Sequence, residues 1–215
     1  MKYTTIIFDL DGTLLNTLAD LAAATNHALA EHKLPQRTTD EVRLFVGNGI
    51  RKLIERAVPA DTPAELQEEV FSSFNKYYKQ HCADSTRPYD GVPQLLQQLR
   101  AAGCRTAIVS NKADYGVQAL AKQYFDGQLD AACGERAGIA KKPAPDMLLA
   151  IMQQLKAEPA STIYIGDSDT DIATASNAGV DCIGACWGFR GRVFLEAHGA
   201  KLLAENVGDI WELIK

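Results

Sequence analysis

Short apolar runs alternate with helical patterns through most of this 215-residue chain. Residues 6–8, 106–109 and 162–165 are mostly β-branched or otherwise apolar, and these runs are too short to be buried helices. They predict buried β-strands. Helical patterns separate the later runs, and a strand that returns through a helix pairs in parallel with the strand before it. The alternation therefore predicts an α/β fold, with a parallel sheet covered by helices on both faces.

The chain from about residue 88 onward predicts a regular succession of elements. Gly103 and Gly179 follow two of the helical patterns and are typical of helix C-termini. In order, the pattern predicts a helix at 92–102, a strand at 106–109, a helix at 116–124, a strand at 128–133, a helix at 146–155, a strand at 162–165, a helix at 169–178 and a strand at 181–183.

Residues 16–83 follow a different pattern, because helical segments succeed one another there with no strand between them. Two stretches, Thr38–Glu41 and Thr62–Glu65, have the spacing of a capping box and predict helix starts. The sequence thus predicts two domains. One is an α/β core of residues 1–15 and 84–215, and the other is an all-helical insertion of residues 16–83.

The composition excludes several classes of function. Hydrophobic residues make up 47% of the chain and charged residues 23%, as in an ordinary globular protein. A formal net charge of −5 and the lack of a basic run argue against nucleic acid as a partner. No apolar stretch approaches the ~20 residues that span a bilayer, and the first strand is too short for the core of a signal peptide. We expect a cytoplasmic protein, monomer or dimer, that binds neither nucleic acid nor membrane.

Polar side chains follow three of the predicted strands, at the point where each strand ends. Asp9 and Asp11 follow the first strand, Ser110-Asn111 the second, and Asp167 the third, with Asp171 close behind. Because ligands bind beyond the carboxyl ends of parallel strands, these side chains can converge there. Clustered carboxylates repel one another without a counter-ion, and oxygen ligands suit Mg²⁺. The sequence therefore predicts a magnesium site at this edge of the sheet.

The first of these tips carries two acids two residues apart, in Asp9-Leu10-Asp11-Gly12-Thr13. Residues at this spacing in a strand face the same side, so Asp9 and Asp11 can share one site. Such a pair can hold a divalent cation, supply an anionic nucleophile, or divide into an acid and a base. The alternative is an Asp-Gly turn capped by its neighbours.

A cation is available in Lys141-Lys142-Pro143-Ala144-Pro145. The prolines hold this segment extended and can fix the direction of the adjacent lysine. This favours Lys142 over Lys141 as the residue that enters the site. The alternative is a pair of solvated charges in a loop.

With these four groups of residues in this order, the chain resembles the haloacid dehalogenase superfamily of phosphatases, and within it the phosphoglycolate phosphatases. The family's motifs correspond to Asp9–Thr13, Ser110-Asn111, Lys142 before proline, and Gly166–Asp171. The resemblance covers essentially the whole chain. It implies a Rossmann-like core, and it makes the helical insertion of residues 16–83 the family's cap domain.

The resemblance also implies a mechanism, the hydrolysis of a phosphomonoester through an aspartyl-phosphate. Asp9 would be the nucleophile, and Asp11 would be the general acid that protonates the leaving alkoxide and then takes a proton from water. Mg²⁺ would be held by the Asp9 carboxylate, the Asp11 backbone carbonyl and Asp167. Asp171 would orient a metal-bound water or Lys142.

Four residues would bind the transferring phosphoryl group, whose charge needs fixed donors and a cation. They are Ser110, Asn111, Lys142 and Thr13. Closing the turn after Gly12 is an alternative role for Thr13.

The cap would choose the substrate, a small phosphorylated metabolite. Residues 46–51 resemble a cap segment of phosphoglycolate phosphatases, so Gly47, Asn48 and Arg51 are candidate specificity residues. Arg51 can meet a substrate carboxylate, because a guanidinium binds one bidentately.

Other readings of the same motifs remain open. A phosphomutase of the β-phosphoglucomutase type shares the fold, the acids and the metal, and a pyrophosphatase would share them too. A non-catalytic phospho-acceptor module that signals through a modified Asp9 is a third alternative. The large helical insertion and a general acid at Asp11 favour turnover, and phosphoglycolate is the best single substrate prediction.

Overall fold

The computed structural model describes all 215 residues, and they form two compact units. One unit comprises residues 1–15 and 88–215, and the other comprises residues 16–87. The chain passes between the units along a two-stranded ribbon, in which β2 (Leu15–Asn16) pairs with β3 (Arg87–Pro88). The return strand lies slightly later in the sequence than the expected domain boundary.

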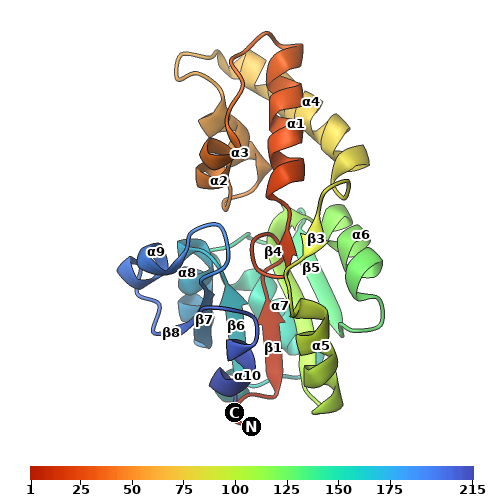
Figure 1. The fold of residues 1–215 in the computed structure, drawn as a ribbon, viewed down its shortest axis with the longest axis vertical. Coiled ribbons are helices and arrows are strands. Elements are labelled where there is room, and N and C mark those ends of the chain that lie inside the picture. Colours follow the sequence, from red (N-terminus) through yellow and green to blue (C-terminus); the bar gives the residue numbers. More distant parts are fainter. The chain divides into compact units, whose positions relative to one another are not determined.

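The sheet of the first unit consists of six strands: β1 (Thr5–Phe8), β4 (Arg105–Ala113), β5 (Ala131–Glu135), β6 (Thr162–Gly166), β7 (Asp181–Ala185) and β8 (Leu202–Ala204). Their spatial order is β5-β4-β1-β6-β7-β8, and every neighbouring pair is parallel (Figure 1). β1 is therefore central, with β4 and β6 beside it. This architecture confirms the predicted α/β class.

Helices cover both faces of this sheet. They are α5 (Val92–Ala101), α6 (Asp114–Phe125), α7 (Asp146–Leu155), α8 (Asp169–Ala178), α9 (Arg192–Ala197) and α10 (Asp209–Leu213), with a turn of 3-10 helix at Pro159–Ser161. Ile7, Val109 and Tyr164 point from three central strands into one buried cluster with residues of α7 and α8. Because side chains alternate along a strand, their neighbours face the opposite side, where Figure 1 shows α5 and α10.

The structure corrects the predicted end of one strand. β4 does not end at Val109 but continues through Ser110, Asn111 and Lys112 to Ala113. Between Val109 and Ala113 the pairing with β5 is irregular, because four residues along β4 advance against two along β5. Such a bulge changes the direction of the side chains beside it, and this one lies where the polar residues Ser110, Asn111 and Lys112 begin. The short elements α9, β8 and α10 were not predicted.

The second unit consists of α1 (Leu18–Glu31), α2 (Thr39–Phe45), α3 (Ile50–Ala57) and α4 (Ala64–His81), packed around their own apolar cluster. The capping box predicted at Thr38–Glu41 is present, with both of its hydrogen bonds. The one predicted at Thr62–Glu65 is wrong. Pro63 is the N-cap of α4 without a side-chain cap, and the backbone carbonyl of Thr62 accepts a hydrogen bond from Gln67 instead.

A buried carboxylate closes the second unit on itself. Asp20 in α1 accepts hydrogen bonds from the backbone N–H groups of Ser85 and Thr86 and from the Thr86 hydroxyl, at 2.7–3.1 Å. These bonds join the start of the helical segment to its end. They fix the backbone just before β3, where the chain returns to the sheet.

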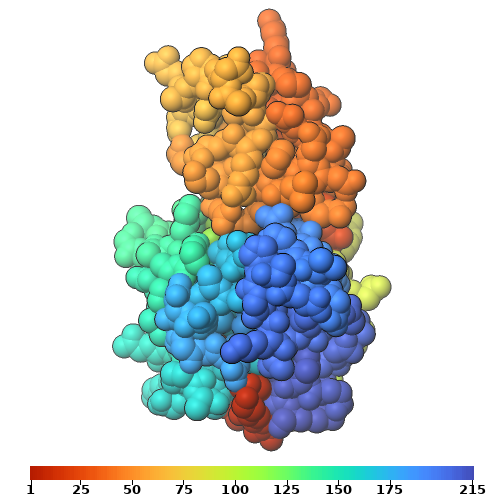
Figure 2. Space-filling view, turned by 90° about the vertical axis from the view of Figure 1, so that its left-hand side faces the viewer, coloured from red at the N-terminus to blue at the C-terminus, as the bar shows by residue number.

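The two termini lie side by side in the first unit. The backbone N–H of Lys2 donates to the carbonyl of Lys215 at 2.8 Å. Figures 1 and 2 show the first residues beside the C-terminal ones, at the end of the sheet away from the carboxyl ends of the strands. Among the helices of both units, none has the length and apolar character needed to cross a membrane.

Candidate active site

Asp9 follows β1 directly and lies at the carboxyl edge of the sheet. Its backbone N–H still donates to Ile165 of β6 at 2.8 Å, so the residue is held in sheet register. Oδ1 accepts a hydrogen bond from the backbone N–H of Leu10 at 2.7 Å. The side chain is buried, which leaves it accessible only from within the site.

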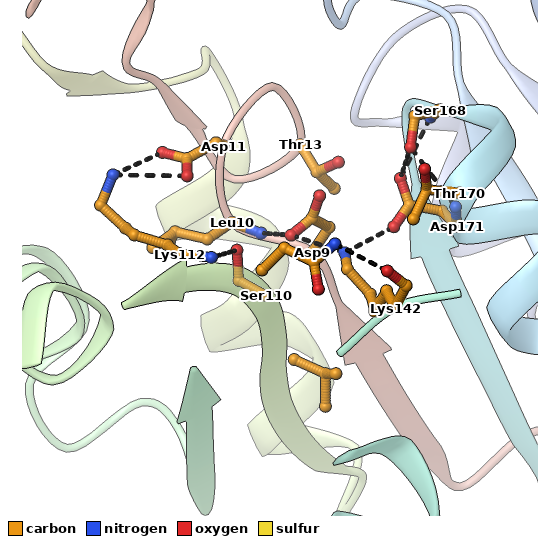
Figure 3. A network of polar contacts seen from close by, with 12 residues as sticks. Asp9, Leu10, Asp11, Thr13, Ser110, Lys112, Lys142, Ser168, Thr170 and Asp171 are labelled. Atoms are coloured by element: carbon orange, nitrogen blue, oxygen red, sulfur yellow. Dashed lines mark hydrogen bonds and ion pairs between the residues drawn. The ribbon is translucent and has the colours of Figure 1, made fainter. Parts of the chain in front are cut away.

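Lys142 is the cation of this site. Its ammonium lies 3.0 Å from Oδ1 of Asp9 and 2.7 Å from Oδ1 of Asp171, and it also donates to the Tyr164 hydroxyl at 2.9 Å (Figure 3). The Tyr164 hydroxyl lies 2.8 Å from the backbone carbonyl of Val109, to which it donates. A cis peptide bond joins Lys142 to Pro143. Lys142 is buried and therefore depends on these partners for its charge.

Lys141 points elsewhere. Its ammonium is half-exposed and lies 3.6 Å from Glu135. Of the two adjacent lysines, Lys142 is thus the one that enters the cluster of carboxylates.

The Asp171 carboxylate, at the start of α8, lies within hydrogen-bond distance of the side chains of Ser168, Lys142 and Tyr164. Oδ2 accepts hydrogen bonds from the hydroxyl and the backbone N–H of Ser168, at 2.6 and 3.1 Å, in a capping box that begins the helix. Oδ1 faces Lys142. A helix cap therefore fixes the carboxylate that in turn fixes the lysine.

Asp167 is packed into a cradle of glycines. A Cβ on Gly12, whose φ is +84°, would lie 2.3 Å from Oδ2 of Asp167, and a Cβ on Gly188 would lie 2.2 Å from the Asp167 Cβ. Only glycine fits at either position. The backbone N–H of Phe189 donates to Oδ2 at 2.6 Å, and the Thr13 hydroxyl lies 3.5 Å from Oδ1.

Asp9, Asp167 and Asp171 form a cluster of buried carboxylates. Carboxylate oxygens of Asp9, Asp167 and Asp171 lie within 4.8 Å of one another, and all three side chains are buried. Burial raises the pKa of Asp9 to about 7, against the opposing charge of Lys142, and raises the pKa of Asp167 well above its usual value. Burial lowers the pKa of Lys142, but Asp171 and Asp9 more than reverse this and raise it. A single lysine faces three acids, and a set of buried oxygens of this kind fits Mg²⁺.

Asp11 lies apart from this cluster. Its side chain turns toward Lys112, whose ammonium is 3.0 and 3.3 Å from the two carboxylate oxygens (Figure 3). The predicted metal ligand at this position is the backbone carbonyl, so the side chain is free for another role. Sequence reasoning did not single out Lys112, although it directly follows Ser110-Asn111.

The residues predicted to bind phosphate lie around Asp9, and all are buried. The Ser110 hydroxyl accepts a hydrogen bond from the backbone N–H of Lys112 at 3.3 Å. The Asn111 amide donates to the backbone carbonyl of Lys142 at 2.9 Å, so it ties β4 to the segment that carries the lysine. The structure thus brings Ser110, Asn111, Thr13 and Lys142 to one edge of the sheet.

Sequence reasoning assigned no role in the site to several groups that support it. Trp187 donates from Nε1 to the backbone carbonyl of Thr13 at 3.0 Å, next to Gly188 and the Phe189 N–H that contact Asp167. The run Trp187-Gly188-Phe189-Arg190, which follows β7, was the available signal. Tyr164 gave no such signal, because a tyrosine in an apolar strand is usually a core residue.

The candidate specificity residues lie in the second unit. Arg51 of α3 pairs through both terminal nitrogens with Glu68 of α4, at 2.5 and 3.3 Å, and its guanidinium lies 4.2 Å from the centre of the Phe71 ring. These residues line a hollow of about 180 Å³. Asn48 accepts a hydrogen bond from Arg56 at 2.7 Å, and Gly47 has a φ of +126° in the turn before α3.

Comparison with known proteins identifies the family. Residues 6–185 match the family described as haloacid dehalogenase-like hydrolase. The chain belongs to this family. The match includes β1, the whole helical unit and the strands that carry the site.

Within this hydrolase family the chain is similar to several phosphatases. A phosphoglycolate phosphatase of Aquifex aeolicus is 33% identical over 189 residues, 86% of this chain and 85% of that protein. An N-acetylmuramic acid 6-phosphate phosphatase of Pseudomonas aeruginosa is 29% identical, over 100% of this chain and 96% of that protein. The crystal structure of a candidate phosphoglycolate phosphatase from Lactobacillus delbrueckii subsp. bulgaricus has a TM-score of 0.94 and 35% identity, covering 100% of this chain and 99% of that one. These matches confirm the resemblance and make the chain a phosphatase.

Proposed function

We propose that this protein is a Mg²⁺-dependent phosphomonoester hydrolase that acts through an aspartyl-phosphate, with phosphoglycolate as its substrate. The observation that carries the proposal is the position of Asp9. It is a buried carboxylate that touches Lys142 and lies beside Asp167 and Asp171 at the carboxyl edge of the sheet.

Asp9 is the nucleophile in this proposal. One carboxylate oxygen attacks phosphorus as the bond to the leaving alkoxide breaks, so the phosphoryl group moves from the ester to Asp9. Two anions must meet for this step. Lys142 supplies a fixed positive charge at Oδ1 of Asp9. Ser110, Asn111 and Thr13, which are buried at the same edge of the sheet, would position the phosphoryl oxygens.

Asp9, Asp167 and the backbone carbonyl of Asp11 would hold Mg²⁺. Bound there, the ion supplies further positive charge that offsets the repulsion between nucleophile and phosphate. Asp171 already serves Lys142 and Ser168, so its role is to support the lysine.

Asp11 carries the proton. It protonates the leaving alkoxide while the aspartyl-phosphate forms, and it then takes a proton from the water that attacks phosphorus and releases Asp9. The separation of its side chain from the cluster of three acids supports this division of labour.

The helical unit of residues 16–87 is proposed to act as the cap that selects the ester. Gly47 and Asn48 shape the turn before α3, and Arg51 is the proposed partner of a substrate carboxylate. Relatives that are named for phosphoglycolate support this ester as the first choice. The relative named for N-acetylmuramic acid 6-phosphate makes a bulkier sugar phosphate the second ester to try.

A screen for phosphate release tests this function. The purified protein is assayed with Mg²⁺ and with a chelator, on phosphoglycolate, N-acetylmuramic acid 6-phosphate, other sugar phosphates and pyrophosphate. We expect Mg²⁺-dependent release from phosphoglycolate that Asp9→Asn abolishes and that Asp169→Asn, at an exposed acid nearby, preserves. Interconversion of glucose phosphates without release would indicate a mutase, and labelling of Asp9 without turnover would indicate a phospho-acceptor module.

A further inference from the structure

Lys112 is a buried lysine that the proposed chemistry does not use. Its side chain is only 3% exposed, yet it carries an ammonium that contacts both carboxylate oxygens of Asp11. Figure 3 shows the Asp11 carboxylate turned toward this ammonium and away from Lys142. The site therefore contains two separate ionic groups, Lys142 with Asp9 and Asp171, and Lys112 with Asp11.

The packing around Lys112 makes room for its apolar stem. Gly116, one turn into α6, has no side chain, and a Cβ there would lie 3.4 Å from Cε and 3.6 Å from Cδ of Lys112. The ammonium of a surface lysine usually stays in water and is mobile. Here the stem is enclosed, so the ammonium is held at one place.

The backbone of Lys112 is equally constrained. Its N–H donates to the Ser110 hydroxyl, and Gly134 of β5 packs so closely that a Cβ would lie 2.6 Å from the Lys112 carbonyl oxygen. The Asp114 carboxylate accepts a hydrogen bond from the Gly134 N–H at 2.8 Å. The end of β4, its irregular pairing with β5 and the start of α6 together fix the position of the Lys112 backbone.

We infer that Lys112 is a positioning residue, which fixes the side-chain rotamer of Asp11 so that the proton carrier stays apart from Asp9 and is presented to the leaving group. This inference rests on the proposed function of Asp11. A general acid contributes only when it is within hydrogen-bond reach of the leaving oxygen, so its rotamer governs the rate.

The inference predicts a dependence on the leaving group. An alkoxide leaves only with a proton, whereas p-nitrophenolate leaves without one. Misplacing Asp11 should therefore slow aspartyl-phosphate formation from an alkyl ester and spare p-nitrophenyl phosphate. The ratio kcat/KM reports the steps up to departure of the leaving group, so it excludes the later hydrolysis in which Asp11 also takes part.

Lys112→Met tests this, because methionine fills the enclosed space without the charge. We expect kcat/KM to fall about 10- to 100-fold on phosphoglycolate and less than about threefold on p-nitrophenyl phosphate. Lys141→Met, which makes the same change at a half-exposed lysine that points away from the acids of the site, is the matched control and should change neither value. Added to Asp11→Asn, Lys112→Met should have no further effect. Equal losses on both esters, or additive losses in the double variant, would overturn the inference.

A crystal structure of Lys112→Met gives a readout that does not depend on turnover. We expect the Asp11 carboxylate to leave the position it holds here, and an unchanged Asp11 rotamer would overturn the inference. If Lys112→Met fails to fold, Lys112→Leu, which also lacks a donor, replaces it in both experiments. A wild-type protein that releases no phosphate from either ester in Mg²⁺ would overturn the proposed function, while the rotamer of Asp11 would still decide the structural claim.

Discussion

The ammonium of Lys142 lies 3.0 Å from Oδ1 of Asp9, and both groups are buried. The lysine is held on its far side by Asp171, 2.7 Å away, which is itself fixed as the cap of α8. The nucleophile Asp9 therefore lies beside a positive charge, the Lys142 ammonium, whose position is fixed through Asp171 by the start of α8. Its reactivity depends on residues from three segments of the chain that fold together, the end of β1, the segment of Lys142 and the start of α8.

Replacing Lys142 by methionine should remove both turnover and stability. We expect kcat/KM to fall by about 10²- to 10³-fold, because a fixed donor to the phosphoryl group is lost. Buried acids left without their cation should also cost roughly 3–5 kcal/mol of unfolding free energy, measured by urea denaturation. Lys141→Met should alter neither, because Lys141 makes only a half-exposed pair with Glu135. Equal effects of the two substitutions would contradict the role of Lys142 as a donor to the phosphoryl group and as the counter-charge of the buried acids.

The pH dependence of stability should report the buried Asp9. Burial raises its pKa from 3.8 to about 7, so between about pH 4 and pH 7 the folded protein holds a proton there that the unfolded chain has released. Stability of the metal-free protein must therefore fall as the pH rises through this window. We expect the unfolding free energy of Asp9→Asn to decrease less with pH than that of the wild type. The difference between the two decreases should reach up to a few kcal/mol at pH 8.

The measurement is thermal and urea unfolding in chelator at pH 4, 6 and 8. Asp169→Asn, at an exposed acid, should keep the wild-type slope. Added Mg²⁺ should stabilise the wild type at pH 8 more than it stabilises Asp9→Asn, because a ligand that binds the folded state raises its stability. A slope unchanged by Asp9→Asn would contradict the assigned titration.

The glycine cradle of Asp167 should be sensitive to a single methyl group. In Gly188→Ala the new Cβ would lie 2.2 Å from the Asp167 Cβ and 2.5 Å from the Gly12 carbonyl oxygen, so backbone must shift. We expect the Mg²⁺ concentration for half-maximal activity to rise about 10- to 100-fold. Gly208→Ala is the control, because its φ is −65° and the nearest atom is the Asn206 amide oxygen at 3.1 Å. Unchanged Mg²⁺ dependence in Gly188→Ala would argue against Asp167 as a ligand.

The pair between Arg51 and Glu68 should compete with a substrate carboxylate. In Glu68→Gln the guanidinium loses its charged partner, so KM for phosphoglycolate should fall about twofold to fivefold, the scale of an exposed ion pair. Arg51→Ala should raise that KM. Ethyl phosphate, which lacks the carboxylate, should show the same KM in both variants as in the wild type. Parallel changes on the two esters would mean that Arg51 does not bind the carboxylate.

Elements with local signals were predicted well. α7 and α8 have the predicted bounds, 146–155 and 169–178, and for α8 both ends are set by neighbours in sequence, the Ser168 capping box and Gly179. The buried strands were found because they are continuous apolar runs. The elements α9, β8 and α10 were missed because they are too short for a periodic pattern to develop.

The contacts within the site were less predictable, because they join distant parts of the chain. Asp11 and Lys112 are 101 positions apart, and Phe189, which follows β7, is 22 positions from Asp167. The motifs identified which acids lie at the sheet edge. They did not indicate that the side chain of Asp11 leaves the cluster, since its partner Lys112 lies in the irregularly paired stretch of β4, beside Gly116.

The pairing of β2 with β3 means that the helical unit begins and ends at adjacent backbone positions. None of the six sheet strands lies within it, and the proposed nucleophile, proton carrier and lysine are encoded outside it. Under the proposed function, the unit is thus a module that can be exchanged separately from the reacting residues. A different set of helices with equally close ends could replace it and redirect the same phosphoryl chemistry to another ester, so selectivity and reactivity can evolve in separate stretches of one gene.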